Sequence, residues 1–135
     1  MRNKMRGMTL IELVVVVSII ALLATIAVPS YRQFLLKSHR AEAKAALLNL
    51  AAAQEKFYLQ NNTYTTDLTT APPAGLGLTP TTVNGHFTVA IAAGANAAGF
   101  TATATAAGGQ AQDTRCATFT IDQAGTRTAT SVDCW

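Results

Sequence analysis

Hydrophobic and polar positions are distributed very unevenly along this chain. Residues 8–28 are predominantly aliphatic, and the only ionisable side chain among them is Glu12. A helix of this length spans about 31 Å at 1.5 Å per residue, which matches the hydrocarbon core of a bilayer. The β-branched residues 14–17 would favour a strand in water, but a lone segment in lipid must satisfy its backbone hydrogen bonds internally. We therefore expect a transmembrane helix.

A second helix-forming region follows this segment. Pro29 cannot donate a hydrogen bond to the carbonyl of Thr25, so the helix is expected to bend or end there. Residues 30–59 contain neither Gly nor Pro and are rich in Ala and Leu, which are strong helix formers. The pattern therefore predicts one bent helix over about residues 8–59, with an apolar first half and an Ala-rich second half.

The last part of the chain has the period-two alternation of half-buried strands. A long loop over residues 61–85 comes first, because Pro and Gly recur there. Beyond the loop we expect three or four antiparallel strands with one apolar face, over residues 86–92, 100–106, 117–122 and 126–129. Large apolar residues are too few for this sheet to form a core alone, so it must pack on the Ala-rich helix. The fold class is α+β.

Charge and composition exclude several classes of protein. The net charge of +3 comes entirely from Arg2, Lys4 and Arg6, because the remaining basic and acidic residues are equal in number. A nucleic-acid partner is therefore not expected. Only 13% of residues are charged and 50% are hydrophobic, which excludes a disordered polyelectrolyte. The sequence has no phosphate-binding loop, nucleophile elbow or cluster of metal ligands, so we expect no enzyme, no catalytic residue, no cofactor and no metal.

Glu12 is the residue that most needs an explanation. A carboxylate inside the apolar zone costs about 2.5–3.5 kcal/mol on insertion scales, and residues 8–28 include no Lys or Arg to pair with it. Glu12 could be protonated, or it could reach the headgroup layer. The segment could also be a cleaved secretory signal, but it exceeds the usual apolar region of about 7–15 residues in such signals.

The string GMTLIE at residues 7–12 follows a short basic leader and precedes the apolar helix and Pro29. This combination resembles the class III signal of type IV pilins and related prepilins. The resemblance implies cleavage between Gly7 and Met8 by a membrane peptidase on the cytoplasmic side, followed by methylation of the new amine of Met8. That amine of one subunit could then meet Glu12 of a neighbour during filament assembly. The chain departs from the family at Met8, where phenylalanine is most common, and at Ala21, where many members have glycine.

The resemblance also implies the type IV pilin fold. In this fold a long bent helix packs on a small antiparallel sheet that ends in a disulfide-bounded region, here between Cys116 and Cys134. From the residues alone, the two cysteines could also be free thiols or a metal pair, although His39 and His86 are distant in sequence and are expected to be solvated. The pattern CxxFTIDQxGTR from Cys116 and the final DCW resemble minor pilins of the type IVa class.

The expected organisation is a cleaved leader (1–7), a transmembrane and filament-core helix (8–28), an amphipathic helix (29–60), a loop (61–85) and the sheet with its disulfide (86–135). We expect a structural pilus subunit, with a minor pilin favoured over a major pilin, a type II secretion pseudopilin, a DNA-receptor pilin or another anchored protein. The expected partners are other pilin subunits, the prepilin peptidase and methyltransferase, the inner-membrane assembly machinery and, before assembly, the lipid bilayer. The cysteine pair favours an N-terminus in the cytoplasm and a periplasmic C-terminal domain, which later becomes part of an extracellular pilus.

Overall fold

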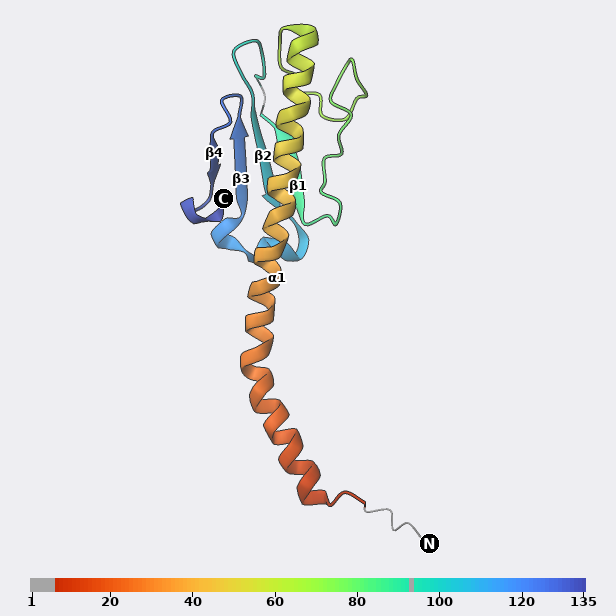
Figure 1. Ribbon diagram of the computed structural model, residues 1–135, viewed down its shortest axis with the longest axis vertical. Coiled ribbons are helices and arrows are strands. Elements are labelled where there is room, and N and C mark those ends of the chain that lie inside the picture. Colours follow the sequence, from red (N-terminus) through yellow and green to blue (C-terminus); the bar gives the residue numbers. More distant parts are fainter. Residues whose placement is uncertain (1–6, 93) are drawn as a thin grey trace. The chain divides into compact units, whose positions relative to one another are not determined.

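The computed structural model describes residues 7–92 and 94–135. The chain divides into two compact units, Met1–Leu35 and Leu36–Trp135. One helix, α1 (Leu10–Asn61), runs through both of them (Figure 1). Arg2, Lys4 and Arg6, the basic residues of the expected leader, lie outside the described residues.

The predicted long helix is confirmed, and its two ends have local causes. Thr9 precedes the first helical residue, and its carbonyl accepts the first helical hydrogen bond, from the backbone N–H of Leu13 (3.1 Å). At the other end Asn62 has φ +53° and donates its N–H to the Tyr58 carbonyl (2.8 Å). Asn tolerates this left-handed conformation, which stops a helix. Pro29 lies inside α1, so the helix does not end there; a bend at Pro29 stays a prediction.

In the first unit nearly all the described side chains of α1 are exposed. Every residue from 7 to 34 is exposed, including large aliphatic side chains such as Leu10 (81%) and Ile26 (70%). A helix that is apolar all round is stable only in an apolar environment, such as a membrane or the interior of a larger assembly. Among the described residues, α1 alone is long and apolar enough to cross a bilayer.

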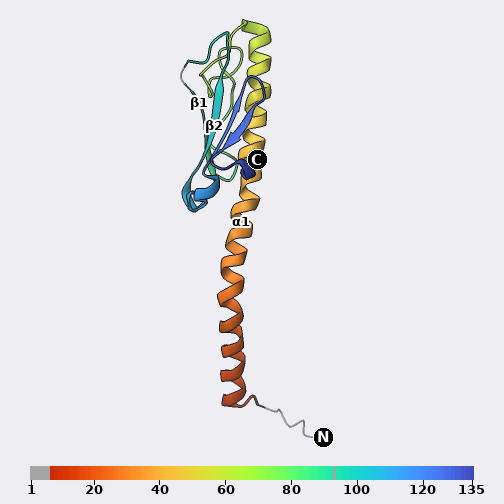
Figure 2. The ribbon, with the colours of Figure 1, turned by 90° about the vertical axis from the view of Figure 1, so that its left-hand side faces the viewer.

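In the second unit α1 covers one face of a four-stranded antiparallel sheet, as Figure 2 shows. The strand order is β1-β2-β3-β4, so each strand pairs with its neighbour in sequence. The strands are β1 (Phe87–Ile91), β2 (Thr101–Ala106), β3 (Thr118–Asp122) and β4 (Arg127–Ala129). The predicted sheet is therefore confirmed, and each of its four strands begins one residue later than the pattern indicates.

The core of this unit lies between α1 and the inner face of the sheet. Leu47 and Leu50 of α1 are fully buried, together with Phe87 of β1 and Phe119 of β3, whose rings meet edge to face at 5.8 Å. In the strand register Ala104 lies between Val89 and Phe119. This alternation of small and large side chains leaves room for both aromatic rings beneath the helix.

The C-terminal disulfide is present and closes the sheet region. It joins Cys116, at the end of a short 3₁₀ helix (Thr114–Cys116), to Cys134 in a second one (Val132–Cys134). Both cysteines are buried, and Trp135 packs edge to face on Phe119 at 5.8 Å. The alternatives of free thiols or a metal pair are therefore wrong. The bridge fixes the end of the chain beside the start of β3.

Candidate functional site

Glu12 lies in the first turn of α1 and has a hydrogen-bond partner within its own helix. The backbone N–H of Thr9 donates to Glu12 Oε2 (3.4 Å), and the backbone N–H of Glu12 donates to Thr9 Oγ1 (3.3 Å). This reciprocal arrangement of a threonine before the helix and a glutamate three residues later is a capping box. A search of the sequence for a Lys or Arg near Glu12 does not find this partner. The sequence signal for the capping box is the T-x-x-E spacing at residues 9–12.

The capping box leaves the Glu12 carboxylate available to other groups. Thr9 and Glu12 are both exposed, and both of their hydrogen bonds are longer than 3.2 Å, at the weak end of the range. A carboxylate at a helix N-terminus is also favoured by the helix dipole, by about 0.3–1 kcal/mol. These interactions are small enough for a nearby cation to replace the hydrogen bond from Thr9.

The Gly7–Met8 bond precedes the capping box and lies outside any helix or strand. Met8 is 68% exposed, and a side chain added at Gly7 would have no atom within 4 Å. The bond is therefore accessible in the chain as described. Among the described residues, none packs closely enough against Gly7 to require a glycine there.

The rest of the apolar stem has its polar side chains satisfied internally. The hydroxyl of Ser18 donates to the carbonyl of Val14 (2.7 Å), and that of Thr25 donates to the carbonyl of Leu22 (2.7 Å). Glu12 is thus the one ionisable group that the stem presents between residues 8 and 28. Gly7 and Met8 lie just before α1 and Glu12 lies in its first turn, whereas Pro29 lies farther along the helix.

A second polar cluster, in the unit Leu36–Trp135, was not expected. Arg40 of α1 forms a two-pronged ion pair with Asp113, with Nε donating to Oδ2 (2.7 Å) and a terminal guanidinium nitrogen to Oδ1 (2.9 Å). Gln110, which is 1% exposed, donates to the Leu36 carbonyl (3.0 Å) and to Asp113 (3.3 Å). The cluster fastens the connection between β2 and β3 to the helix.

The two histidines belong to this cluster, and the expectation that they are solvated is wrong. Their rings stack at 3.7 Å, and both side chains are half-buried. Because the Gln110 amide nitrogen is used by Leu36 and Asp113, its oxygen must accept from His39 Nδ1 at 3.0 Å. Their rings are parallel rather than convergent, and the described residues contain no group of three ligands able to hold a metal ion.

Glu42 connects the histidines to the loop before β1. Burial alone would raise the pKa of Glu42, but hydrogen bonds from Asn84 and Thr82 and the neighbouring His86 lower it below its ordinary value. His86 Nδ1 lies 3.3 Å from Glu42 Oε2, where the two atoms form an ion pair when the imidazole is protonated. These contacts link α1 to the segment that leads into β1.

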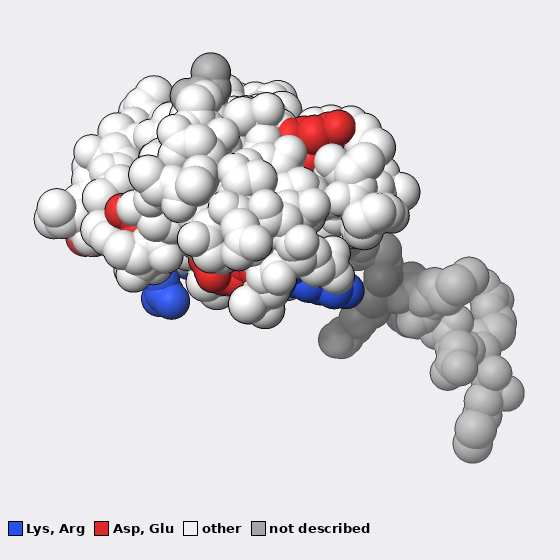
Figure 3. Space-filling view, turned by 90° about the horizontal axis from the view of Figure 1, so that it is seen from above, with Lys and Arg blue, Asp and Glu red and all other residues white. Residues whose placement is uncertain are grey.

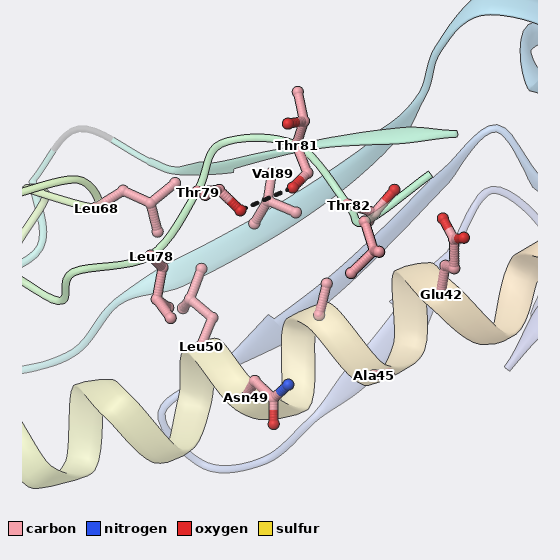
Figure 4. A pocket seen from close by; sticks show the side chains of 12 residues that line it. Glu42, Ala45, Asn49, Leu50, Leu68, Leu78, Thr79, Thr81, Thr82 and Val89 are labelled. Carbon is pink, nitrogen blue, oxygen red and sulfur yellow. Dashed lines mark hydrogen bonds between the residues drawn. The ribbon is translucent and has the colours of Figure 1, made fainter. Parts of the chain in front are cut away.

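A small cavity lies between α1, the loop over residues 68–83 and β1 (Figure 4). Leu50, Leu68, Leu78 and Val89 provide its apolar walls, and Glu42 lies at one end. Its volume is about 220 Å³, below the roughly 300–1,000 Å³ of most small-molecule sites. We assign it no ligand.

Two family models match the chain, and together they cover most of its length. One is described as the prokaryotic N-terminal methylation motif and matches residues 2–28. The other is described as type IV minor pilin ComP, DNA uptake sequence receptor, and matches residues 29–120. The second match alone covers more than half of the chain.

Similar proteins are pilus subunits from several bacteria. The chain is 46% identical to the type IV major pilin protein PilA of Myxococcus xanthus over 59 residues, which are 44% of this chain and 27% of that protein. It is 35% identical to the type IV wide pilus major component PilA4 of Thermus thermophilus over 62% of this chain and 63% of the relative. It is 34% identical to the fimbrial protein EcpC of Eikenella corrodens over 71% of this chain and 61% of the relative. The matches thus span between about a quarter and two-thirds of these relatives.

A solved structure shares the fold. It is described as a high-resolution structure of a type IV pilin from Shewanella oneidensis, with a TM-score of 0.50 and 24% sequence identity. The match covers 74% of this chain and 97% of the other. At this level of identity the likeness concerns the fold alone.

Proposed function

This chain belongs to the type IV pilin family, and from that premise we propose that it is a minor pilin, cleaved between Gly7 and Met8 and needed for assembly of the pilus. Pilins are structural subunits, so the chain is not an enzyme. Its relatives include major pilins, and a major pilin is the alternative role.

The observation that carries the proposal is the position of Glu12 at the start of an exposed apolar stem. The stem needs an apolar environment, which lipid supplies before assembly and neighbouring stems supply in a filament. In both environments an unpaired carboxylate is costly. The capping box with Thr9 provides a partner for Glu12 in the single chain.

Cleavage after Gly7 would provide a second and stronger partner. It creates an α-amine on Met8, which is positively charged near pH 7, and methylation changes its size without removing the charge. An ammonium group adds the attraction of a full positive charge for the carboxylate, which the neutral backbone N–H of Thr9 cannot supply. The amine of one subunit would therefore displace the weak bond from Thr9 on its neighbour and set the register between the two stems.

The proposed partners and location follow from this mechanism. The peptidase and methyltransferase must reach Gly7 and Met8 on the cytoplasmic side, while the unit Leu36–Trp135 lies in the periplasm, where its disulfide can form. The inner-membrane assembly machinery then moves the stem from lipid into the extracellular filament, where other pilins surround it.

The test compares Glu12→Gln with Glu12→Ala in cells that make the pili. Glutamine keeps the hydrogen-bond acceptor of the capping box but cannot pair with a cation. We expect both variants to insert in the membrane and to lose their first seven residues, but to be missing from sheared filaments. Ser18→Ala, which removes only a hydroxyl bonded within the helix, should assemble normally.

Three outcomes would contradict parts of the proposal. Normal incorporation of Glu12→Gln would show that the cap rather than the charge matters. A mature chain that still begins at Met1 would refute processing at Gly7. Wild-type subunit in amounts that account for the whole filament would make it a major rather than a minor pilin.

A DNA-receptor pilin is a second candidate, favoured by the description of the family that matches residues 29–120. Against it, the unit Leu36–Trp135 has equal numbers of basic and acidic residues, and two of its arginines are paired with Asp113 and Asp133. On the face drawn in Figure 3, charged side chains are scattered and form no basic stripe. Duplex binding whose affinity falls steeply with salt would support this candidate.

A further inference from the structure

The first aromatic residues of the chain come just after the apolar stem. Residues 8–28 contain no Phe, Trp or Tyr, whereas Tyr31 and Phe34 follow within about two turns, with Arg32 between them. All three are exposed, Tyr31 by 63% and Phe34 by 67%. Large aromatic side chains at adjacent exposed positions are unusual on a surface that faces only water, and they commonly mark an interaction site.

We propose that Tyr31, Arg32 and Phe34 form an anchor in the phospholipid headgroup layer on the periplasmic side, which fixes the depth of α1 in the membrane before assembly. The proposal rests on membrane insertion of the stem, as in the proposed function. The three residues are continuous with the membrane-spanning segment, and lipid is the surface that this segment already contacts.

The chemistry of the three side chains fits this layer. Tyrosine concentrates at membrane interfaces because its ring is apolar and its hydroxyl is polar. The Phe34 ring can lie against the acyl chains next to the headgroups. The methylene groups of Arg32 can lie along the helix while its guanidinium group binds a lipid phosphate. Tyr31 and Phe34 are three residues apart and therefore share one side of the helix.

The anchor has a geometric consequence for Glu12. Nineteen residue steps separate Glu12 from Tyr31, or about 28 Å of helix at 1.5 Å per residue. With Tyr31 at one edge of a hydrocarbon core about 30 Å thick, Glu12 lies at the opposite edge. If residues 8–28 were instead centred in the core, Glu12 would lie about 6 Å inside it. The anchor thus places the capping box and the cleavage site at the cytoplasmic headgroups.

Depth measurements on the full chain in vesicles of phosphatidylethanolamine and phosphatidylglycerol test the anchor. Ser18→Cys takes a fluorescent label, because both native cysteines are in the disulfide, and lipids with quenchers at known depths locate it. The chain also carries Glu12→Ala, so that the carboxylate cannot set the depth. We expect Tyr31→Ala/Phe34→Ala to move the label toward the bilayer midplane by about 4–5 Å, or three residues.

Two matched variants make the result specific. Tyr31→Trp/Phe34→Trp keeps interfacial aromatic rings and should leave the label where it is, as should Leu48→Ala/Leu59→Ala, which removes two exposed apolar side chains from the other unit. If the label in the Tyr31→Ala/Phe34→Ala chain stays at the same depth, the proposed anchor is wrong. The two rings would then act only within the filament. A chain that does not float with the vesicles at all would instead overturn the membrane insertion on which the proposed function depends.

Discussion

The ion pair between Arg40 and Asp113 provides the sharpest test of how the second unit is held together. Asp113 is 5% exposed and receives two hydrogen bonds from Arg40, at 2.7 and 2.9 Å, and one from Gln110 at 3.3 Å. Arg40→Ala would leave a buried carboxylate with only its long bond to Gln110. We therefore expect a large loss of stability.

The magnitude follows from the burial of the pair. Removing one partner of a buried ion pair typically costs 3–5 kcal/mol, because the other charge stays buried without compensation. We expect the lower end, about 3 kcal/mol, because the Arg40 side chain is 15% exposed and partly screened. For a unit of about this size, 1 kcal/mol corresponds to roughly 4–8 °C. The predicted fall in Tm is therefore about 12–24 °C.

Thermal unfolding of the full chain in detergent micelles measures this loss, followed by fluorescence of Trp135, the single tryptophan. Arg115→Ala is the matched control, because its ion pair with Asp133 is more than half exposed and should contribute less than about 1 kcal/mol. Arg40→Met/Asp113→Leu should recover most of the stability, since no charge is left buried. Equal losses for Arg40→Ala and Arg115→Ala would refute the reasoning.

Two further predictions concern the same unit. Replacing Cys116 and Cys134 by serine should lower the free energy of unfolding by about 2–5 kcal/mol, and an unchanged Tm would show that the bridge adds no stability. Glu42 has a lowered pKa, so its contribution to stability is present above its ordinary value of 4.5 and is lost as the pH falls through the lower value in the folded state. Denaturant unfolding should therefore show the free energy of unfolding falling below about pH 4.5. This free energy should fall less steeply with pH in Glu42→Gln than in the control Glu55→Gln. Equal dependence on pH in the two variants would exclude this role for Glu42.

Several elements could be predicted from the sequence because their signals are local. The alternation of Phe87, Val89 and Ile91 indicates β1, and the stretch without Gly or Pro after Pro29 indicates that the helix continues. The capping box of Thr9 and Glu12 is also local and could have been predicted from its spacing. Such signals depend only on residues within one or two turns of each other.

The polar cluster around Gln110 could not be predicted in this way. His39 and Gln110 are 71 positions apart, and Arg40 and Asp113 are 73 apart. Before the fold is known, each of them is an ordinary polar residue on a helix or in a loop. His39 and His86 are not solvated as expected because they stack on each other and His39 donates a hydrogen bond to the buried Gln110.

The sequence alone determines the apolar stem, the N-terminal methylation motif over residues 2–28 and the ionisable residue at position 12, because each is carried by contiguous residues whose chemistry does not depend on the rest of the chain. Only the tertiary structure decides which polar side chains are buried and what pairs with them. The reason is physical: a buried charge is tolerated only beside its partner, and the packing of the sheet on α1 is what brings partners together across more than seventy positions.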